Sequence, residues 1–239
     1  AEAGFWPLYE GKHIEQFLVD IKPIERWVSL EACERKYGKP PDPGPKLVFR
    51  DIARNTDERT CIAAVLPERS CANHKLPIMR YADGIEPALL SVMNSLAFDF
   101  TVRLRSGSTS LTFSHLARCP VPDPSAVMGP DLNGLSGIEH VSTVRDHWPD
   151  LWLFNRAVAE AYDLTPDDFA HILSTFPVFA RKRPAFFAYL QKRLAEWAEE
   201  VRQADKPTVH YEAEHEKNVV LQVAEGGMEP INANPERRD

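Results

Sequence analysis

The sequence predicts an α+β protein, with a small mixed or antiparallel sheet and helices first and a helical C-terminal part after them. Two short apolar runs, at 46–53 and 59–66, flank a polar centre and are typical of paired strands. Beyond about residue 125, apolar residues recur with the 3.6-residue period of helices. We therefore expect three parts: an α+β part at 1–125, a helical part at 126–204 and an acidic, flexible tail at 205–239.

The first half alternates short elements with loops. Residues 5–20 mix aromatic and polar side chains and predict extended or irregular backbone. Residues 23–37 place Ile24, Trp27 and Val28 near one helical face and predict a helix. The Pro/Gly-rich stretch 36–46 predicts a loop. Further along we expect a strand at 76–81, an apolar helix at 86–97, an ordered segment at 98–105 and a flexible loop at 105–110.

The second half reads as consecutive helices. Periodic apolar residues predict them at 141–148, 151–162, 164–176 and 184–204. In the third, Thr165 is a candidate N-cap and Pro166 fits the first helical position. In the last, one apolar stripe is formed by Phe187, Leu190, Leu194 and Trp197.

Charge is distributed unevenly along the chain. The net charge of −7 argues against a generic basic polyanion binder. Residues 46–118, however, hold 10 Lys and Arg against 7 Asp and Glu, a net +3, so one face can still attract nucleic acid. The four cysteines lack disulfide-framework spacing, which favours a reducing, cytoplasmic setting. No apolar run is long enough to cross a membrane, so we expect no membrane partner.

Motifs for common enzyme chemistry are missing from the sequence. It contains neither GxGxxG nor GxxxxGK[ST], and neither GxSxG nor HExxH, which lowers the expectation of an enzyme acting alone. Two pairs, Cys71 with His74 and His115 with Cys119, have zinc-like spacing, but 40 residues separate them and ordinary packing is favoured. We therefore expect no metal site. Cys61 lies among apolar neighbours and reads as a buried thiol rather than a nucleophile.

The polar centre of the predicted hairpin has two readings. In one, its arginines form ion pairs with the neighbouring acids, which exposed side chains do readily. In the other, Arg54, Asn55, Thr56 and Arg59 donate hydrogen bonds to phosphates or base edges, a task that suits arginine and asparagine. The functional reading adds a second basic, hydroxyl-rich group, made of Lys75, Arg103, Arg105, Ser106, Ser108 and Thr109.

Two stretches carry a family resemblance. LVFRDIARNTDERTCIAAVLP (47–67) has the pattern R-x-I-A-x-x-T-x-x-R-T and ends in proline. LLSVMNSLAFDFTVRLRSGSTSLTFSHLARCPVP (89–122) follows with L-x-x-x-N-S-x-x-x-D, a basic loop and P-V-P. Together they resemble the target-recognition region of adenine-specific (N6) DNA methyltransferases of the fused restriction–modification (type IIG) and phage-defence kind. PLYEGKHIEQF (7–17) and DLTPDDFAHILSTFPVFARKRP (163–184) are similar to the segments before and after that region.

The resemblance implies a DNA-reading role for this chain. Double-stranded DNA would be its partner, and the segments 67–78 and 103–112 would set sequence choice. We expect Arg59, Asn94 and Asp99 to be partly structural, because polar groups buried between elements need partners.

Catalysis would belong to another domain. The S-adenosylmethionine-binding motif and the Asn/Asp-Pro-Pro-aromatic motif of such methylases are missing from the sequence, so we expect no cofactor and no catalytic residues in it. The resemblance implies an upstream catalytic methyltransferase domain that binds S-adenosylmethionine, and the chain, which does not begin with methionine, would be the C-terminal piece of that enzyme. Two alternatives stay open: a protein-interaction scaffold without DNA contact of its own, and a hydrolase that uses a cysteine or an aspartate.

Overall fold

The α+β prediction is confirmed by a computed structural model. It describes residues 4–19, 21–52, 54, 56–80, 86–105, 109–127 and 147–204. The predicted tail and most of the predicted helix at 141–148 lie outside these residues. Within the described part, no helix is both long and apolar enough to cross a membrane.

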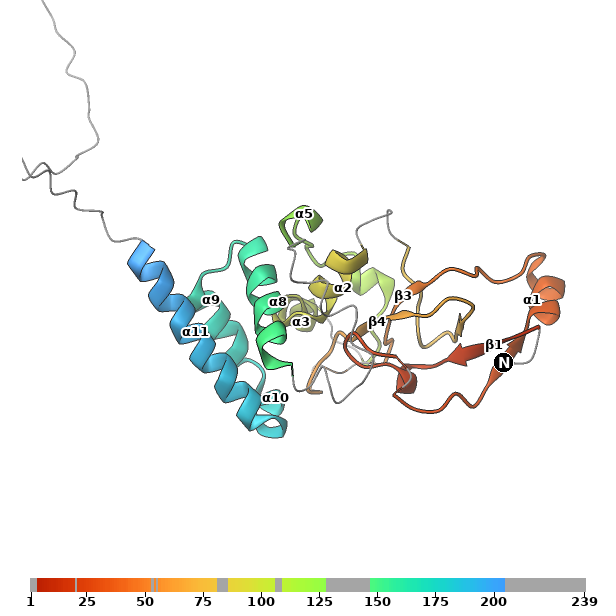
Figure 1. The fold of residues 1–239 in the computed structure, drawn as a ribbon, viewed down its shortest axis with the longest axis horizontal. Helices are drawn as coiled ribbons and strands as arrows, with labels where there is room; N and C mark the ends of the chain where they lie inside the picture. The colour runs from red at the N-terminus through yellow and green to blue at the C-terminus, as the bar shows by residue number, and fades with distance from the viewer. Residues whose placement is uncertain are drawn as a thin grey trace, which may run out of the picture. The chain divides into compact units, whose positions relative to one another are not determined.

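Two small sheets form in the first half (Figure 1). In one, β1 (Phe5–Tyr9) lies between β2 (Trp27–Ser29), to which it is antiparallel, and β5 (Cys71–Ala72), to which it is parallel. In the other, the antiparallel strands β3 (Lys46–Phe49) and β4 (Ala63–Leu66) pair from end to end. Both strands of this hairpin are shorter than predicted, because polar contacts of the loop between them replace ladder hydrogen bonds.

Two predictions for the first half were wrong in part. The helix expected at 23–37 begins only at Leu30, because Trp27–Ser29 pairs with β1 and the Ser29 hydroxyl then caps α1 (Leu30–Tyr37). The strand expected at 76–81 is reduced to a bridge between Ile78 and Val48 in its described residues. Pro77, which has no N–H, can only accept a hydrogen bond from Phe49 there.

Polar side chains fix the centre of the fold. The apolar helix expected at 86–97 is divided into α2 (Glu86–Asn94) and α3 (Leu96–Arg105), and the Ser95 hydroxyl at the break accepts a hydrogen bond from the N–H of Phe98 at 3.1 Å. Short helices follow, α4 (Phe113–Leu116) and α5 (Pro124–Val127).

Three of the helices predicted for the second half are present, as α8 (Trp148–Ala161), α9 (Pro166–Ser174) and α11 (Pro184–Ala204). A further short helix, α10 (Pro177–Lys182), was not predicted. The N-cap prediction is confirmed, because the Thr165 side chain accepts a hydrogen bond from the N–H of Asp168. In α11, the buried stripe contains Phe186 where Phe187 was predicted; Phe187 is only partly buried.

One hydrophobic core joins the two halves. Trp152 and Phe154 of α8 are buried in the same cluster as Phe49 of β3 and Phe98 of α3. The rings of Phe17 and Phe154 pack edge to face, with their centres 5.2 Å apart, and this contact links the N-terminal segment directly to α8. The boundary predicted between 125 and 126 therefore separates parts that share a core.

Candidate nucleic-acid interface

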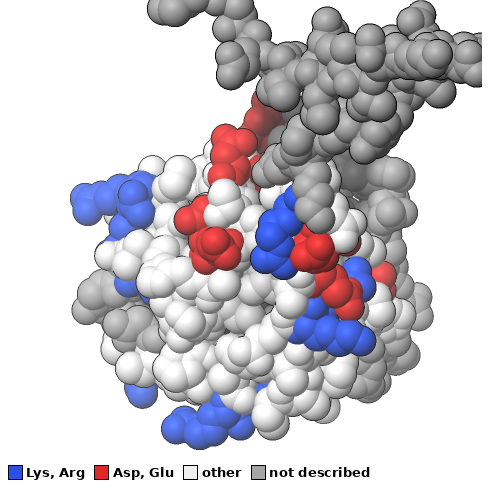
Figure 2. Space-filling view, turned by 90° about the vertical axis from the view of Figure 1, so that its left-hand side faces the viewer, with Lys and Arg blue, Asp and Glu red and all other residues white. Residues whose placement is uncertain are grey.

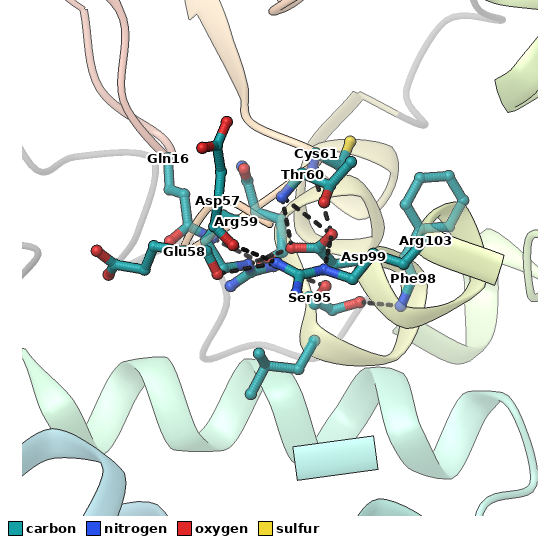
Figure 3. Close-up of polar contacts among 12 residues, drawn as sticks. Gln16, Asp57, Glu58, Arg59, Thr60, Cys61, Ser95, Phe98, Asp99 and Arg103 are labelled. Carbon is teal, nitrogen blue, oxygen red and sulfur yellow. Dashed lines mark hydrogen bonds and ion pairs between the residues drawn. The ribbon is translucent and has the colours of Figure 1, made fainter. Parts of the chain in front are cut away.

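A buried ion cluster underlies the loop between β3 and β4 (Figure 3). The carboxylate of Asp99, on α3, is fully buried and accepts hydrogen bonds from Arg59 Nε at 2.5 Å and Arg103 Nε at 3.3 Å. It also accepts hydrogen bonds from the backbone N–H groups of Thr60 and Cys61. The α3 carboxylate thus holds the second half of the loop against the helix.

The two arginines of this cluster face inward. Arg59 Nη2 donates to the carbonyl oxygens of Asn94 and Ser95, at 2.7 and 2.8 Å, and its side chain is only 8% exposed. Arg103 Nη2 donates to the carbonyls of the loop, and its guanidinium lies 4.1 Å from the ring centre of Phe176. Burial lowers the pKa of Arg103, against the opposing effect of Asp99. Both residues were predicted to contact DNA, but their hydrogen bonds go to the protein.

Two asparagines connect the elements around this cluster. The amide of Asn94 bonds both the N–H and the carbonyl of Ala63, at 3.0 Å each, and so ties the end of α2 to β4. Asn155, which sequence analysis missed, accepts a hydrogen bond from the N–H of Leu96 at 2.9 Å. A polar residue within the apolar run LWLFNRAVA was the signal that could have identified it.

Asp51 joins three segments that sequence analysis treated separately. Its carboxylate accepts hydrogen bonds from Lys75 Nζ at 2.6 Å and from the Ser110 hydroxyl. Its backbone N–H donates to the carbonyl of Lys75, and its carbonyl accepts from the N–H of Leu111. Partial burial raises the pKa of Asp51, but the bonds from Lys75 and Ser110 outweigh this and lower it overall. The hairpin loop and the two predicted reading segments therefore meet at one place.

Of the remaining predicted site residues, the structure describes five. Arg54, Thr56, Arg105 and Thr109 are exposed, and neither arginine side chain has an ion pair with a described residue. The Lys75 side chain is 42% exposed but bound to Asp51. Three further predicted residues, Asn55, Ser106 and Ser108, lie outside the described residues.

Two hollows border the junction. One, of about 290 Å³, lies between the hairpin loop, the N-terminal segment around Gln16, and the end of α10. The other, of about 590 Å³, is lined by residues around Lys12, Lys22 and Lys75. Glu15, Arg50 and Ile52 line both hollows, so the two are neighbours. Because Ile52 also pairs with Ser110, the segment 109–111 lies at their edge.

Basic residues outnumber acidic ones in the lining. Taken together, seven basic and four acidic residues line the two hollows, a net +3 on a chain of net −7. The basic residues are Lys12, Lys22, Arg50, Arg59, Lys75, Lys182 and Arg183, and the acidic ones are Glu10, Glu15, Asp57 and Glu58. The sequence pattern predicted two of these cations, Arg59 and Lys75. It missed Lys12, Lys22, Lys182 and Arg183 because they come from distant segments, and Arg50, although part of the hairpin motif, was not among the predicted DNA contacts.

The face at the α9–α11 end looks different. In Figure 2 its acidic and basic side chains lie in small groups around a broad uncharged area. The visible, described part of that face thus carries no continuous basic strip.

In the described part of the chain, the cysteines and histidines form no group suited to a metal, and Cys61 is a buried thiol. Among the described residues, no three or more His, Cys, Asp or Glu side chains come together as a metal would require. Burial raises the pKa of the Cys61 thiol well above its ordinary value, which keeps it protonated and weakly nucleophilic.

No protein-family model matches the chain, and no curated protein does either. The family resemblance drawn from the motifs therefore remains a prediction.

Proposed function

We propose that the chain binds duplex DNA as the target-recognition part of an adenine-N6 DNA methyltransferase or fused restriction–modification enzyme. The observation that carries this proposal is the junction at Asp51. It brings the hairpin loop and both predicted reading segments to the edge of two hollows whose lining is net basic. Opposite charge on a concave surface favours a phosphate backbone.

The residues divide into a support and a rim. The buried cluster around Asp99 supports the loop, and Arg54 and Arg105 are the exposed cations that would fix the duplex through its phosphates. Side chains of 67–78 and 103–112 would read base edges in the major groove. An upstream catalytic domain with bound S-adenosylmethionine would flip the adenine out of the duplex and methylate it.

A second candidate function is a scaffold that binds protein rather than DNA. Exposed apolar side chains favour it: Leu104 is 68% exposed and Phe113 49% exposed, both near the segment 109–111. Large apolar groups in solvent are common at protein interfaces. A scaffold of this kind predicts no salt-dependent DNA binding.

Duplex binding at about 50 and 200 mM salt tests the proposal. We expect wild-type affinity to fall as the salt concentration rises, so that the slope of log K against log salt is negative. Arg54→Ala/Arg105→Ala should make this slope less negative by about 1.8, or about 0.9 for each lost phosphate contact. Arg35→Ala/Arg202→Ala, which removes two charges from the surfaces of α1 and α11, is the matched control. Equal slopes for both double variants would contradict the placement of these arginines. Lack of wild-type binding would favour the scaffold.

A further inference from the structure

Two lysines in the hollows differ from the other cations. Lys22 and Lys182 make no ion pair or hydrogen bond with any residue that the structure describes. The remaining five cations of the lining already bind acceptors of the protein: Lys12 binds Glu25, Arg50 binds Gly11, Arg59 binds Asp99, Lys75 binds Asp51 and Arg183 binds Glu58.

Pairing decides which cations are available to a polyanion. A paired lysine has to give up its carboxylate before it can neutralise a phosphate, so part of the gain is lost. An unpaired, exposed lysine only exchanges solvent ions for the phosphate, and the released counterions drive binding. Lys22 and Lys182 are both exposed. They are thus the residues of the lining best suited to contact phosphates.

The position of Lys182 is set by its neighbours. It is the last residue of α10. The guanidinium carbon of the next residue, Arg183, lies 4.8 Å from the ring centre of Phe186 and 5.8 Å from that of Phe179. Arg183 also reaches Glu58 of the hairpin loop at 3.8 Å. The corner between α10 and α11 is thereby held against the loop and forms one border of the first hollow.

We propose that the phosphate backbone of the bound DNA runs along both hollows, and that Lys22 and Lys182 contact its phosphates. This inference rests on the proposed function and extends it. The helical part of the chain takes part in DNA binding through α10, and the N-terminal segment takes part through Lys22. The footprint on DNA then exceeds the loops named by the family resemblance.

The double variant Lys22→Ala/Lys182→Ala tests the inference in the full chain. We expect it to make the slope of log K against log salt less negative by about 1.8 relative to wild type. Lys22→Arg/Lys182→Arg should keep the wild-type slope. The matched control is Lys36→Ala/Lys39→Ala, which removes two exposed lysines outside both linings. Unchanged melting temperatures for all variants would exclude unfolding as the cause.

The outcomes separate this inference from the proposed function. If wild type binds and Arg54→Ala/Arg105→Ala weakens binding, while Lys22→Ala/Lys182→Ala behaves as its control, the extended footprint is overturned and the proposed function stands. If wild type binds no duplex at either salt concentration, both are overturned. If the salt dependence weakens in Lys22→Ala/Lys182→Ala but not in Arg54→Ala/Arg105→Ala, phosphate contacts at the hollows are supported. In that case Arg54 and Arg105 make no phosphate contact.

Discussion

Arg54 and Arg59 belong to the same motif, yet the protein uses them differently. Arg59 is enclosed by Asp99 and by carbonyls at the end of α2, whereas Arg54 extends into solvent. A guanidinium with fixed protein acceptors holds a fold together, and an exposed one can meet a ligand. The motif therefore contains, within a few residues, one arginine that holds the fold and one that is exposed to a possible ligand.

Asp99→Asn tests the supporting role. The substitution keeps the shape of the side chain but leaves two buried guanidiniums without a counter-charge. We expect the free energy of unfolding to fall by about 3–5 kcal/mol, as measured by urea denaturation. Glu68→Gln, at an exposed turn, is the control and should change it by less than about 0.5 kcal/mol. Equal effects of the two substitutions would show that the ion cluster does not hold the loop.

At the scale of elements, short segments are held by polar contacts rather than by long ladders. β5 has two residues, and the segment after it has only a bridge to β3. Asp51 compensates by binding Lys75 and Ser110 from two other segments. The arrangement of these three segments at the candidate interface consequently depends on the Asp51 carboxylate.

This dependence predicts a pH effect on stability. The pKa of Asp51 is lower in the folded state than in the unfolded chain, where it is about 3.9. Its ionised form therefore stabilises the fold above that value, and the contribution is lost as the pH falls through the folded pKa. We expect Asp51→Asn to reduce the free energy of unfolding at pH 7 and to reduce it by less at about pH 3, which lies below the unfolded pKa of about 3.9. Urea denaturation at both pH values checks this, and a constant difference would contradict it.

The whole described chain shares one principal core. α8 lies against both α2 and α3, and its Phe154 meets Phe17 near the N-terminus. The α+β part and the helical part therefore bury each other's apolar surface. Such shared burial couples their unfolding, because neither part keeps its core when the other opens.

Phe154→Ala tests this coupling. Removal of a buried ring from α8 should lower the free energy of unfolding by about 3–5 kcal/mol. We expect the amides of the β3–β4 hairpin and those of α8 to lose hydrogen-exchange protection by the same amount, as measured by mass spectrometry. Loss of protection in the helical part alone would show that the two parts unfold independently.

Local signals in the sequence were sufficient for much of the fold. α9 and α11 were predicted because their apolar spacing, their prolines and the Thr165 cap act within a few residues. Pairing of β1 with β2 and β5 was not predicted, because it depends on partners far along the chain. The break at Ser95 was not predicted either; there the Ser95 carbonyl accepts a hydrogen bond from Arg59, and the N–H of Leu96 donates to Asn155. Extended segments acquire their strand identity from such partners.

For the candidate interface, the sequence by itself determined the chemistry: it placed a net positive charge in 46–118, with arginines in the hairpin loop and in the last turn of α3. Only the tertiary structure decided which cations are available. Asp99, forty positions after Arg59, turns that arginine inward, while Lys22 and Lys182 come together with the loops at the hollows. A cation is available to a ligand only where no acceptor of the protein is already paired with it, and the fold decides which cations are paired.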